Sequence, residues 1–342
     1  MLLWIHSFAH LLVDGVCAAA LFGQLTAQGG GAELFMLYNT LAFSTQCLVG
    51  LAADRSKRHR LSAAAAMLCV AAGFALPLPA LPRVALIGLG NSVFHVAAGT
   101  ETLERSGGKA APLGVFVAPG AIGVTVGSLF PALGPVLAGL LAIVGIASVF
   151  VQGSDKKQTD CPRCSPQEPA AEPLHPCGRL GKTPLLAAAL LTAAVAVRAV
   201  GGSAVRFPWQ TTPLLTLLTT GFVFTGKTAG GYLCDRIGPR RSAWFSVPLA
   251  AILICFCGAW MLPSMLGQFA LNLTMPVTLW LLYRCMPDAP GFAFGLAASA
   301  LWPGTLAGRY IALTGQARWV FLPLCFLFGL FAILYSAKGD AL

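Results

Sequence analysis

Gly231-Tyr-Leu-Cys-Asp-Arg-Ile-Gly-Pro-Arg-Arg241 follows a long apolar segment in the second half of the chain, and Gly50-Leu-Ala-Ala-Asp-Arg55 follows another in the first half. The two stretches share a glycine and, four residues later, an Asp-Arg pair. Each stands at the same place in its half if the halves begin at residues 1 and 183. A charged loop repeated at equivalent places in two apolar halves predicts a duplicated architecture.

The composition places the chain in a membrane. Of its 342 residues, 57% are hydrophobic and only 10% are charged, and the mean hydropathy is +0.77. A soluble chain carries roughly a quarter charged residues, so a water-soluble enzyme is disfavoured. A membrane-spanning helix needs about 20 mainly apolar residues. Such segments lie near residues 2–25, 34–53, 61–80, 83–100, 112–131, 133–152, 183–201, 211–233, 242–260, 264–283, 290–308 and 318–336.

The positions of the basic residues predict the orientation of these helices. An even number of crossings puts both termini on one side, and most of the 22 Lys and Arg residues fall in loops on that side. Only Arg83, Arg206, Arg309 and Arg318 fall in loops on the other side. Because positively charged loops stay in the cytoplasm, we expect both termini there and the protein in the plasma (inner) membrane. The net charge of +10 is then a topological signal and does not indicate a nucleic-acid partner.

One long polar stretch divides six apolar segments from six. The prediction is an all-α membrane protein with an N-terminal six-helix bundle over residues 1–152, a cytoplasmic linker over 153–182 and a C-terminal six-helix bundle over 183–342. The Gly-x-x-x-Asp-Arg-x-Gly-x-Arg-Arg pattern of the second copy resembles the helix 2 to 3 signature of the major facilitator superfamily (MFS). The first copy departs from it, with Lys57 in place of the later Gly. The resemblance implies the twelve-helix fold of that family.

In that family the loop aspartate pairs with cationic groups on neighbouring helices and holds the cytoplasmic side closed. The resemblance implies the same role here, and an acid at a helix end beside several Arg can form charge-assisted contacts that break when two bundles rock apart. The basic residues could instead anchor the loops to anionic lipid. The expected gating residues are Gly50, Asp54, Arg55, Gly231, Asp235, Arg236, Gly238, Arg240 and Arg241.

Two further stretches resemble elements of exporters. Residues 114–123 are similar to the Gly/Pro-rich helix 5 motif of the family's antiporters, although small residues there also serve ordinary helix packing. The motif residues are Gly114, Pro119, Gly120 and Gly123. Residues 88–95 resemble the Phe-His element of the fosmidomycin-resistance exporters, with Val96-Ala97 in place of the usual Pro-Glu. Both resemblances favour efflux of a small compound.

Polar residues inside the apolar segments are the candidates for the transport path, because a charge at the bilayer centre costs about 3 kcal/mol and normally faces a cavity. His6, His10 and Asp14 lie on one helical face at i, i+4 and i+8, and His titrates near neutrality, so this row suits a proton path. For His6, a headgroup contact is the simpler interpretation. The predicted substrate and proton pathway comprises Asp14, His10, His95, Lys227, Arg198, Asn39, Gln46, Asn91 and Asn272.

These features predict a secondary active transporter and not an enzyme. An acidic first half facing a basic second half is compatible with an anionic solute that moves together with protons. The expected partners are a small-molecule solute, protons and the lipid bilayer, and the protein is expected to act as a monomer without a cofactor.

Two alternatives involve a metal ion. One is an intramembrane metalloenzyme that uses His6, His10 and Asp14, although Ser7 and Phe8 stand where its glutamate base would be expected. The other is a transporter-like sensor whose central loop binds zinc, although its last two candidate ligands are closer together than in common zinc modules. Those candidate ligands are Cys161, Cys164, His175 and Cys177.

Overall fold

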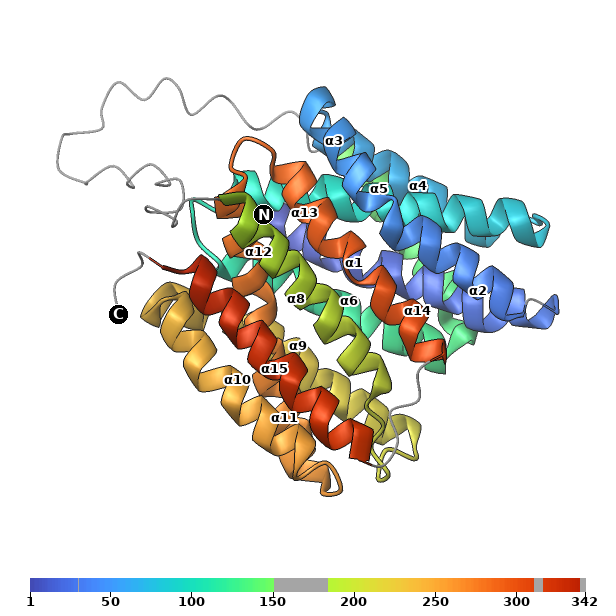
Figure 1. The fold of residues 1–342 in the computed structure, drawn as a ribbon. Coiled ribbons are helices and arrows are strands. Elements are labelled where there is room, and N and C mark those ends of the chain that lie inside the picture. The colour runs from blue at the N-terminus through green and yellow to red at the C-terminus, as the bar shows by residue number, and fades with distance from the viewer. Residues whose placement is uncertain (30, 151–183, 311–315, 339–342) are drawn as a thin grey trace, which may run out of the picture.

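The computed structural model describes residues 1–29, 31–150, 184–310 and 316–338 (Figure 1). The predicted linker, with Cys161, Cys164, His175 and Cys177, lies outside the described residues.

Helices make up nearly all of the described residues, and where one continues closely into the next they form twelve rods. The first half contains α1 (Leu2–Ala19) with η1 (Ala20–Leu25), α2 (Ala32–Asn39) with η2 (Thr40–Ser44) and α3 (Gln46–Ser56), α4 (His59–Ala75), α5 (Ala80–Glu104), α6 (Ala111–Leu129), and η3 (Pro131–Leu133) with α7 (Gly134–Phe150). The second half contains α8 (Pro184–Ala204), α9 (Pro213–Ile237), α10 (Pro239–Cys255), α11 (Met261–Asn272) with α12 (Thr274–Cys285), α13 (Pro290–Ser299) with α14 (Trp302–Tyr310), and α15 (Gln316–Ser336). Each predicted segment falls on one rod.

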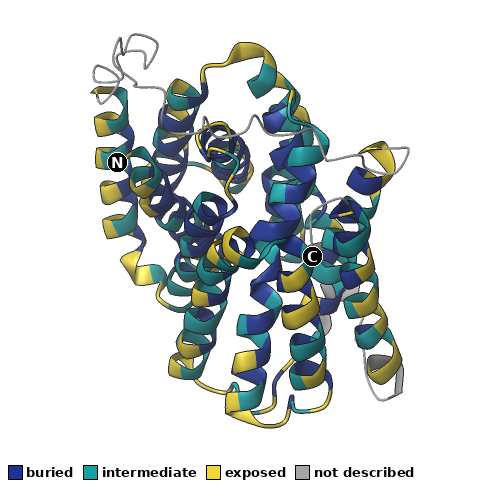
Figure 2. Ribbon diagram, turned by 90° about the vertical axis from the view of Figure 1, so that its left-hand side faces the viewer, coloured by how far each residue is buried: buried dark blue, intermediate teal, exposed yellow. Residues whose placement is uncertain are grey.

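Eight helical stretches among the described residues are long and apolar enough to cross a membrane by length and composition alone. The others are shorter or less apolar: α4 and α10 have 17 residues each, and α9 contains Lys227 and Asp235. Figure 2 shows exposed residues along the outer faces of the bundle, and large apolar side chains such as Ile143, Leu185 and Phe331 are more than half exposed. Water would not favour such a surface, whereas lipid chains would cover it.

Several prolines lie at the start of helices. Pro213 is the first residue of α9, Pro276 lies in the first turn of α12, and Pro303 lies at the start of α14. Proline fits the first turn of a helix because the N–H that it lacks would have no intrahelical partner there.

Most contacts between the two halves in the described chain fall on two helix pairs: α3 packs against α13, and α6 packs against α9. Figure 1 shows α13 and α14, in orange and red, running beside the blue helices of the first half. Within the first half, α1 and α6 pack closely because glycines line the contact. A Cβ added at Gly123 or Gly127 would overlap the backbone of α1 at Leu11 or Gly15.

Candidate functional site

A cavity of about 500 Å³ lies between the two halves. Its wall includes Asp14 of α1, His95 of α5, Arg198 of α8 and Lys227 of α9, and most of the remaining lining is apolar. The cavity extends as far as Val205, just beyond the last residue of α8. Its volume lies in the range of pockets that hold small organic molecules.

Three side chains of the first half form a compact polar cluster in the cavity wall, which we call the triad: His10, Asp14 and His95. The two Nε2 atoms of the histidines are 2.8 Å apart. His10 Nε2 lies 3.2 Å from Asp14 Oδ2, and His95 Nε2 lies 3.5 Å from Asp14 Oδ1. Asn91 donates a hydrogen bond of 3.1 Å from its side-chain amide to Asp14 Oδ1. The triad therefore joins α1 to α5 at the cavity surface.

The opposite ring nitrogens hold both histidines in place. His10 Nδ1 lies 2.8 Å from the carbonyl oxygen of Phe116 on α6, and His95 Nδ1 lies 2.9 Å from the carbonyl oxygen of Asn91. A carbonyl oxygen only accepts, so both Nδ1 atoms donate. Gly120 leaves the room for this arrangement, because a Cβ there would lie 2.5 Å from Asp14 Oδ2 and would overlap the ring of His10.

The separation of the two histidine rings fits a proton better than a metal ion. Two imidazole nitrogens bound to one tetrahedral zinc ion would stand about 3.3 Å apart. The 2.8 Å between His10 Nε2 and His95 Nε2 is shorter and lies in the hydrogen-bond range. The separation therefore matches a hydrogen bond between the rings, whereas a metal ion held by both histidines and Asp14 would require the rings to move apart.

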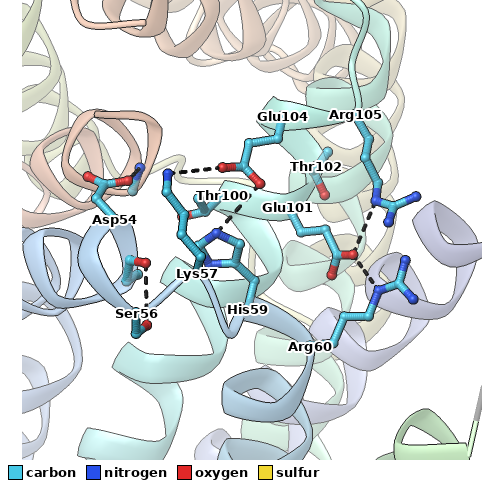
Figure 3. A network of polar contacts seen from close by, with 12 residues as sticks. Asp54, Ser56, Lys57, His59, Arg60, Thr100, Glu101, Thr102, Glu104 and Arg105 are labelled. Atoms are coloured by element: carbon cyan, nitrogen blue, oxygen red, sulfur yellow. Dashed lines mark hydrogen bonds and ion pairs between the residues drawn. The ribbon is translucent and has the colours of Figure 1, made fainter. Parts of the chain in front are cut away.

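His6 does not join the triad. Its Nε2 lies 3.7 Å from Glu101 Oε2, and the same carboxylate accepts from Arg60 Nε at 2.6 Å and from Arg105 Nε at 3.1 Å (Figure 3). The contacts of His6 thus lie at the end of the first half where α5 finishes. The metalloenzyme alternative needed His6 together with His10 and Asp14, and the geometry gives it no support.

The second half contributes the basic side of the cavity. Arg198 donates from Nη1 to Thr274 Oγ1 and from Nη2 to Asn272 Oδ1, each at 3.2 Å. Lys227 Nζ lies 3.4 Å from the carbonyl oxygen of Val117. In the described part of the chain, neither cation has a carboxylate partner. Half-buried positive charges held only by neutral oxygens attract an anion.

The remaining predicted path residues take different positions. Asn91 supports the triad, and Asn272 orients Arg198. Gln46 is fully buried, lines the cavity and donates to the carbonyl oxygen of Ala42. Asn39 lies outside the cavity wall, and its amide donates to the carbonyl oxygen of Phe35 within α2.

Two aspartates close the end of the cavity opposite Val205, each by binding the start of a helix in the other half. Asp54 on α3 accepts from the backbone amides of Gly291 at 2.7 Å and Phe292 at 2.8 Å, in the first turn of α13. Asp235 on α9 accepts from the backbone amides of Ala110 at 2.6 Å and Ala111 at 2.9 Å, where α6 begins. We call these contacts the two aspartate locks. The resemblance implied cationic partners for both acids, whereas here helix N-termini take that place.

The glycine four residues before each aspartate allows the close approach. A Cβ at Gly231 would lie 2.6 Å from the carbonyl oxygen of Ala110, and a Cβ at Gly50 would overlap the backbone of Gly291. Both glycines stand one helical turn before their aspartates, on the same face. Each half therefore presents the same Gly and Asp pair to the other.

The later glycine of the signature serves a backbone conformation. Gly238, which ends α9 and begins α10, has φ +84°. Its counterpart Lys57 ends α3 with φ +53°, in the left-handed region that side chains disfavour. With ψ 19° at Lys57 and ψ 161° at Gly238, the two copies turn differently, and the first carries the strain of a side chain in the left-handed region.

The basic residues of the signature do not contact the aspartates. Arg55, Arg236 and Arg241 are exposed, and Arg240 is half-buried. Their exposure fits the lipid-anchoring interpretation. Figure 3 shows a separate network on the same end of the first half, in which Glu104 Oε1 lies 3.5 Å from Lys57 Nζ and Glu104 Oε2 lies 3.5 Å from His59 Nε2.

Several residues that contact the site could not be predicted from the sequence. Phe116 supplies the carbonyl that binds His10, and its ring lies 6.0 Å from that of Phe294 between centroids, at the closed end of the cavity. Thr274 binds Arg198. Apolar rings and a lone threonine inside membrane helices carry no pattern that separates them from ordinary packing. The only sequence feature that pointed to this part of α6 was the nearby pair Pro119 and Gly120.

The remaining glycines of the helix 5 motif face neighbouring helices. A Cβ at Gly114 would lie 3.1 Å from the carbonyl oxygen of Thr228 on α9, and Gly123 meets α1 as described above. Pro119 lies inside α6 between the two contacts. The motif thus brings α6 close both to α1, which carries His10 and Asp14, and to the second half.

At the level of sequence, no protein-family model and no curated protein matches the chain. Solved structures do match. The crystal structure of a variant of the E. coli fucose:proton symporter FucP superposes with a TM-score of 0.69 at 12% identity, covering 98% of this chain and 98% of that one. The structure described as the MFS transporter FucP in the outward conformation has a TM-score of 0.68 at 11% identity, covering 97% and 98%.

This likeness shows the fold, which is that of the MFS: an all-α membrane protein with twelve transmembrane helices in two six-helix bundles. It confirms the fold expected from the paired signatures. The nearer resemblance to fosmidomycin-resistance exporters receives no support from these structures.

Proposed function

We propose that the protein is a proton-coupled secondary active transporter of a small organic anion, working by alternating access. The observation that carries the proposal is the single cavity in which a His, His and Asp cluster of one half faces Arg198 and Lys227 of the other. A charge-binding site placed between two related bundles is what a transporter of this kind requires.

Alternating access is supported by the contacts between the halves. The aspartate locks hold one end of the cavity shut, and they consist of hydrogen bonds that can break without disturbing either bundle. Positively charged loops make that end cytoplasmic, with both termini on the same side. The structure then corresponds to an outward-facing state, as in one of the FucP structures.

Proton coupling is supported by the triad and by the likeness in fold to FucP, which is a fucose:proton symporter. Histidine changes its charge within the physiological pH range. His10 and His95 contact the only carboxylate in the described cavity wall, so the charge there depends on how many protons the triad holds.

An anionic solute is supported by the state of the two cations. Arg198 and Lys227 have only neutral oxygen partners in the described chain, and Asp14 is already occupied by Asn91 and the histidines. A carboxylate, phosphate or phosphonate group would satisfy them, since these groups accept several hydrogen bonds from Arg. The apolar remainder of the wall suits a solute with an apolar body.

The wider assignments belong to the same proposal. The protein resides in the plasma (inner) membrane, acts as a monomer, divides into bundles at 1–152 and 183–342, and exports its solute. Export is supported by the sequence resemblances of residues 114–123 and 88–95 to exporter elements. A metal-sensing role for the central loop concerns residues outside the described chain.

The test is transport by purified protein in liposomes. Radiolabelled small carboxylates, phosphonates and neutral sugars are screened as separate groups, with and without an imposed pH gradient. We expect gradient-dependent accumulation of an anionic compound, lost in Asp14→Asn and kept in the exposed control Glu33→Gln. Accumulation of sugars alone, or transport of an anion that ignores the pH gradient and is unchanged in Asp14→Asn, would contradict the proposal.

A further inference from the structure

The hydrogen bonds of the triad determine how many protons its two imidazole rings hold. Both Nδ1 atoms point at carbonyl oxygens, Phe116 O for His10 and Asn91 O for His95, so each Nδ1 carries a proton. If both rings were neutral, neither Nε2 would carry one, and two nitrogen lone pairs would face each other at 2.8 Å. That arrangement is repulsive and would be worse beside a carboxylate.

Other proton counts fail for similar reasons. A proton on each Nε2 would place two N–H groups against each other at the same 2.8 Å and leave the triad with a net positive charge. A proton on Asp14 instead would still leave the two Nε2 lone pairs opposed. Asp14 Oδ1 also accepts from Asn91, as an ionised oxygen does. Of these counts, only one proton shared between the two Nε2 atoms gives their contact a donor and an acceptor.

We infer that His10 and His95 together hold three protons in this structure, one of them in an Nε2–H···Nε2 hydrogen bond, and that this shared proton is the one transported. The inference rests on the proposed function. Asp14 remains a carboxylate and neutralises the shared positive charge, and so acts as a positioning residue. The coupling proton therefore resides on an imidazole pair and not on the acid.

The helices packed around the triad contain few other ionisable groups that could share its protons. α6 and α7, which pack against α1, contain no ionisable side chain. On α5 the other charged groups near α1 are Glu101, which pairs with Arg60 and Arg105, and Glu104. Arg83 lies near the start of α5 and donates to the carbonyl oxygen of Leu76. Five other titratable groups of α1, α2 and α4 face or flank the triad: His6, His59, Cys17, Cys69 and Tyr38. Across the cavity stand Lys227 and Arg198.

Loss of the shared proton has a structural consequence. The two Nε2 lone pairs then repel each other, and Asp14 loses its compensating charge. His10 is tied to a second helix through Phe116, whereas the Nδ1 bond of His95 lies within its own helix. His95 is therefore the ring that turns away, toward the cavity and the basic residues of the other half. Deprotonation thus changes a contact at the surface where the halves meet.

Nitrogen NMR tests the proton count directly. The chain has five histidines, and protein labelled with ¹⁵N at histidine is measured in lipid nanodiscs. We expect a scalar coupling between two histidine Nε2 nitrogens across the hydrogen bond, with both Nδ1 atoms protonated, and its loss at high pH. His95→Gln and His10→Gln should each abolish the coupling. His59→Gln, a histidine on α4 outside the triad, should keep it.

An infrared measurement on the same sample separates the two possible proton carriers. A protonated-carboxyl band that disappears in Asp14→Asn would overturn the inference, as would two neutral rings without the coupling. Neither result depends on transport. A protein that moves an anion with protons but lacks the N–H···N coupling contradicts only this inference. One that shows the coupling but transports without protons contradicts the proposed function, and with it the transport of the shared proton, but keeps the proton count.

Discussion

The carboxylate of Asp54 accepts a hydrogen bond of 2.7 Å from the backbone amide of Gly291, which belongs to the other half of the molecule. Asp235 does the same in the opposite direction, to the amide of Ala110 at 2.6 Å. Each half therefore binds the start of a helix in the other. Because amides at a helix N-terminus carry partial positive charge, both contacts are charge-assisted, and the closed end opens only when both break.

Neutralising the two aspartates should open that end. Asp54→Asn combined with Asp235→Asn keeps the size of each side chain but removes its charge, and a hydrogen bond to a charged group contributes about 1.5–3 kcal/mol. We expect the open population to rise roughly tenfold or more for each lock. Pulsed EPR distances between spin labels on α3 and α13, in a cysteine-depleted background, measure the shift.

Glu104→Gln is the matched control for this experiment. It removes a carboxylate at the same end, but the partners of Glu104 are Lys57 and His59 in its own half. Its distance distribution should equal that of the unmodified protein. If the double variant also leaves the distances unchanged, the locks do not hold the closed state.

The first signature copy should become more stable when its glycine is restored. Lys57 adopts φ +53°, a conformation that costs a side chain roughly 1–2 kcal/mol, so Lys57→Gly should relieve that strain. The exposed pair with Glu104 that is lost contributes less. At the equivalent place in the other half, Gly238 has φ +84° and ψ 161°, a region that essentially only glycine adopts, so Gly238→Ala should destabilise by at least as much.

Thermal unfolding in detergent measures both variants. Opposite shifts of the midpoint, upward for Lys57→Gly and downward for Gly238→Ala, are expected. A lower midpoint for Lys57→Gly would show that the ion pair, or the entropy of the unfolded glycine, outweighs the strain.

The helical architecture could be predicted from the sequence because it depends on local properties. Apolar length fixes each rod, and the placement of Lys and Arg fixes an even number of crossings. The His10 and Asp14 pair also follows from spacing, since i and i+4 share a helix face. These features need no knowledge of which helices touch.

Contacts between distant helices could not be predicted in the same way. The sequence indicates that Asp54 lies at a helix end, but its partner is a pair of backbone amides near Gly291, and backbone amides leave no trace in the side-chain pattern. Asn39 is the opposite case, because the sequence predicts a cavity residue that the structure places elsewhere. Its amide donates to Phe35 O on its own helix, and it does not line the cavity. Cross-helix geometry separates such cases, and a single sequence does not contain it.

Gly120 should be essential for the triad. A Cβ at this position would lie 2.5 Å from Asp14 Oδ2 and overlap the ring of His10, so Gly120→Ala should force the two side chains apart. Overpacking of this kind destabilises by about 1–3 kcal/mol, which leaves the fold intact. We expect proton-dependent transport in liposomes to fall at least tenfold, with a normal elution profile. Gly139→Ala on α7, where nothing lies within 4 Å, should transport normally, and equal activity of both variants would refute the steric argument.

Arg198 should determine the affinity for an anionic solute. Its guanidinium is held by Thr274 Oγ1 and Asn272 Oδ1, each at 3.2 Å, and has no acidic partner in the described chain. Arg198→Gln removes the charge, and the loss of one charge-assisted contact of about 1.5–3 kcal/mol should raise the KM for the anion roughly tenfold or more. Arg206→Gln, which removes an exposed charge just beyond α8 that does not line the cavity, should leave the KM unchanged. Because this difference concerns binding, it should appear at saturating pH gradient and should vanish for a neutral analogue of the solute. An equal rise in KM in both variants would mean that the basic residues attract anions through the general surface potential, and Arg198 would then have no specific contact with the solute.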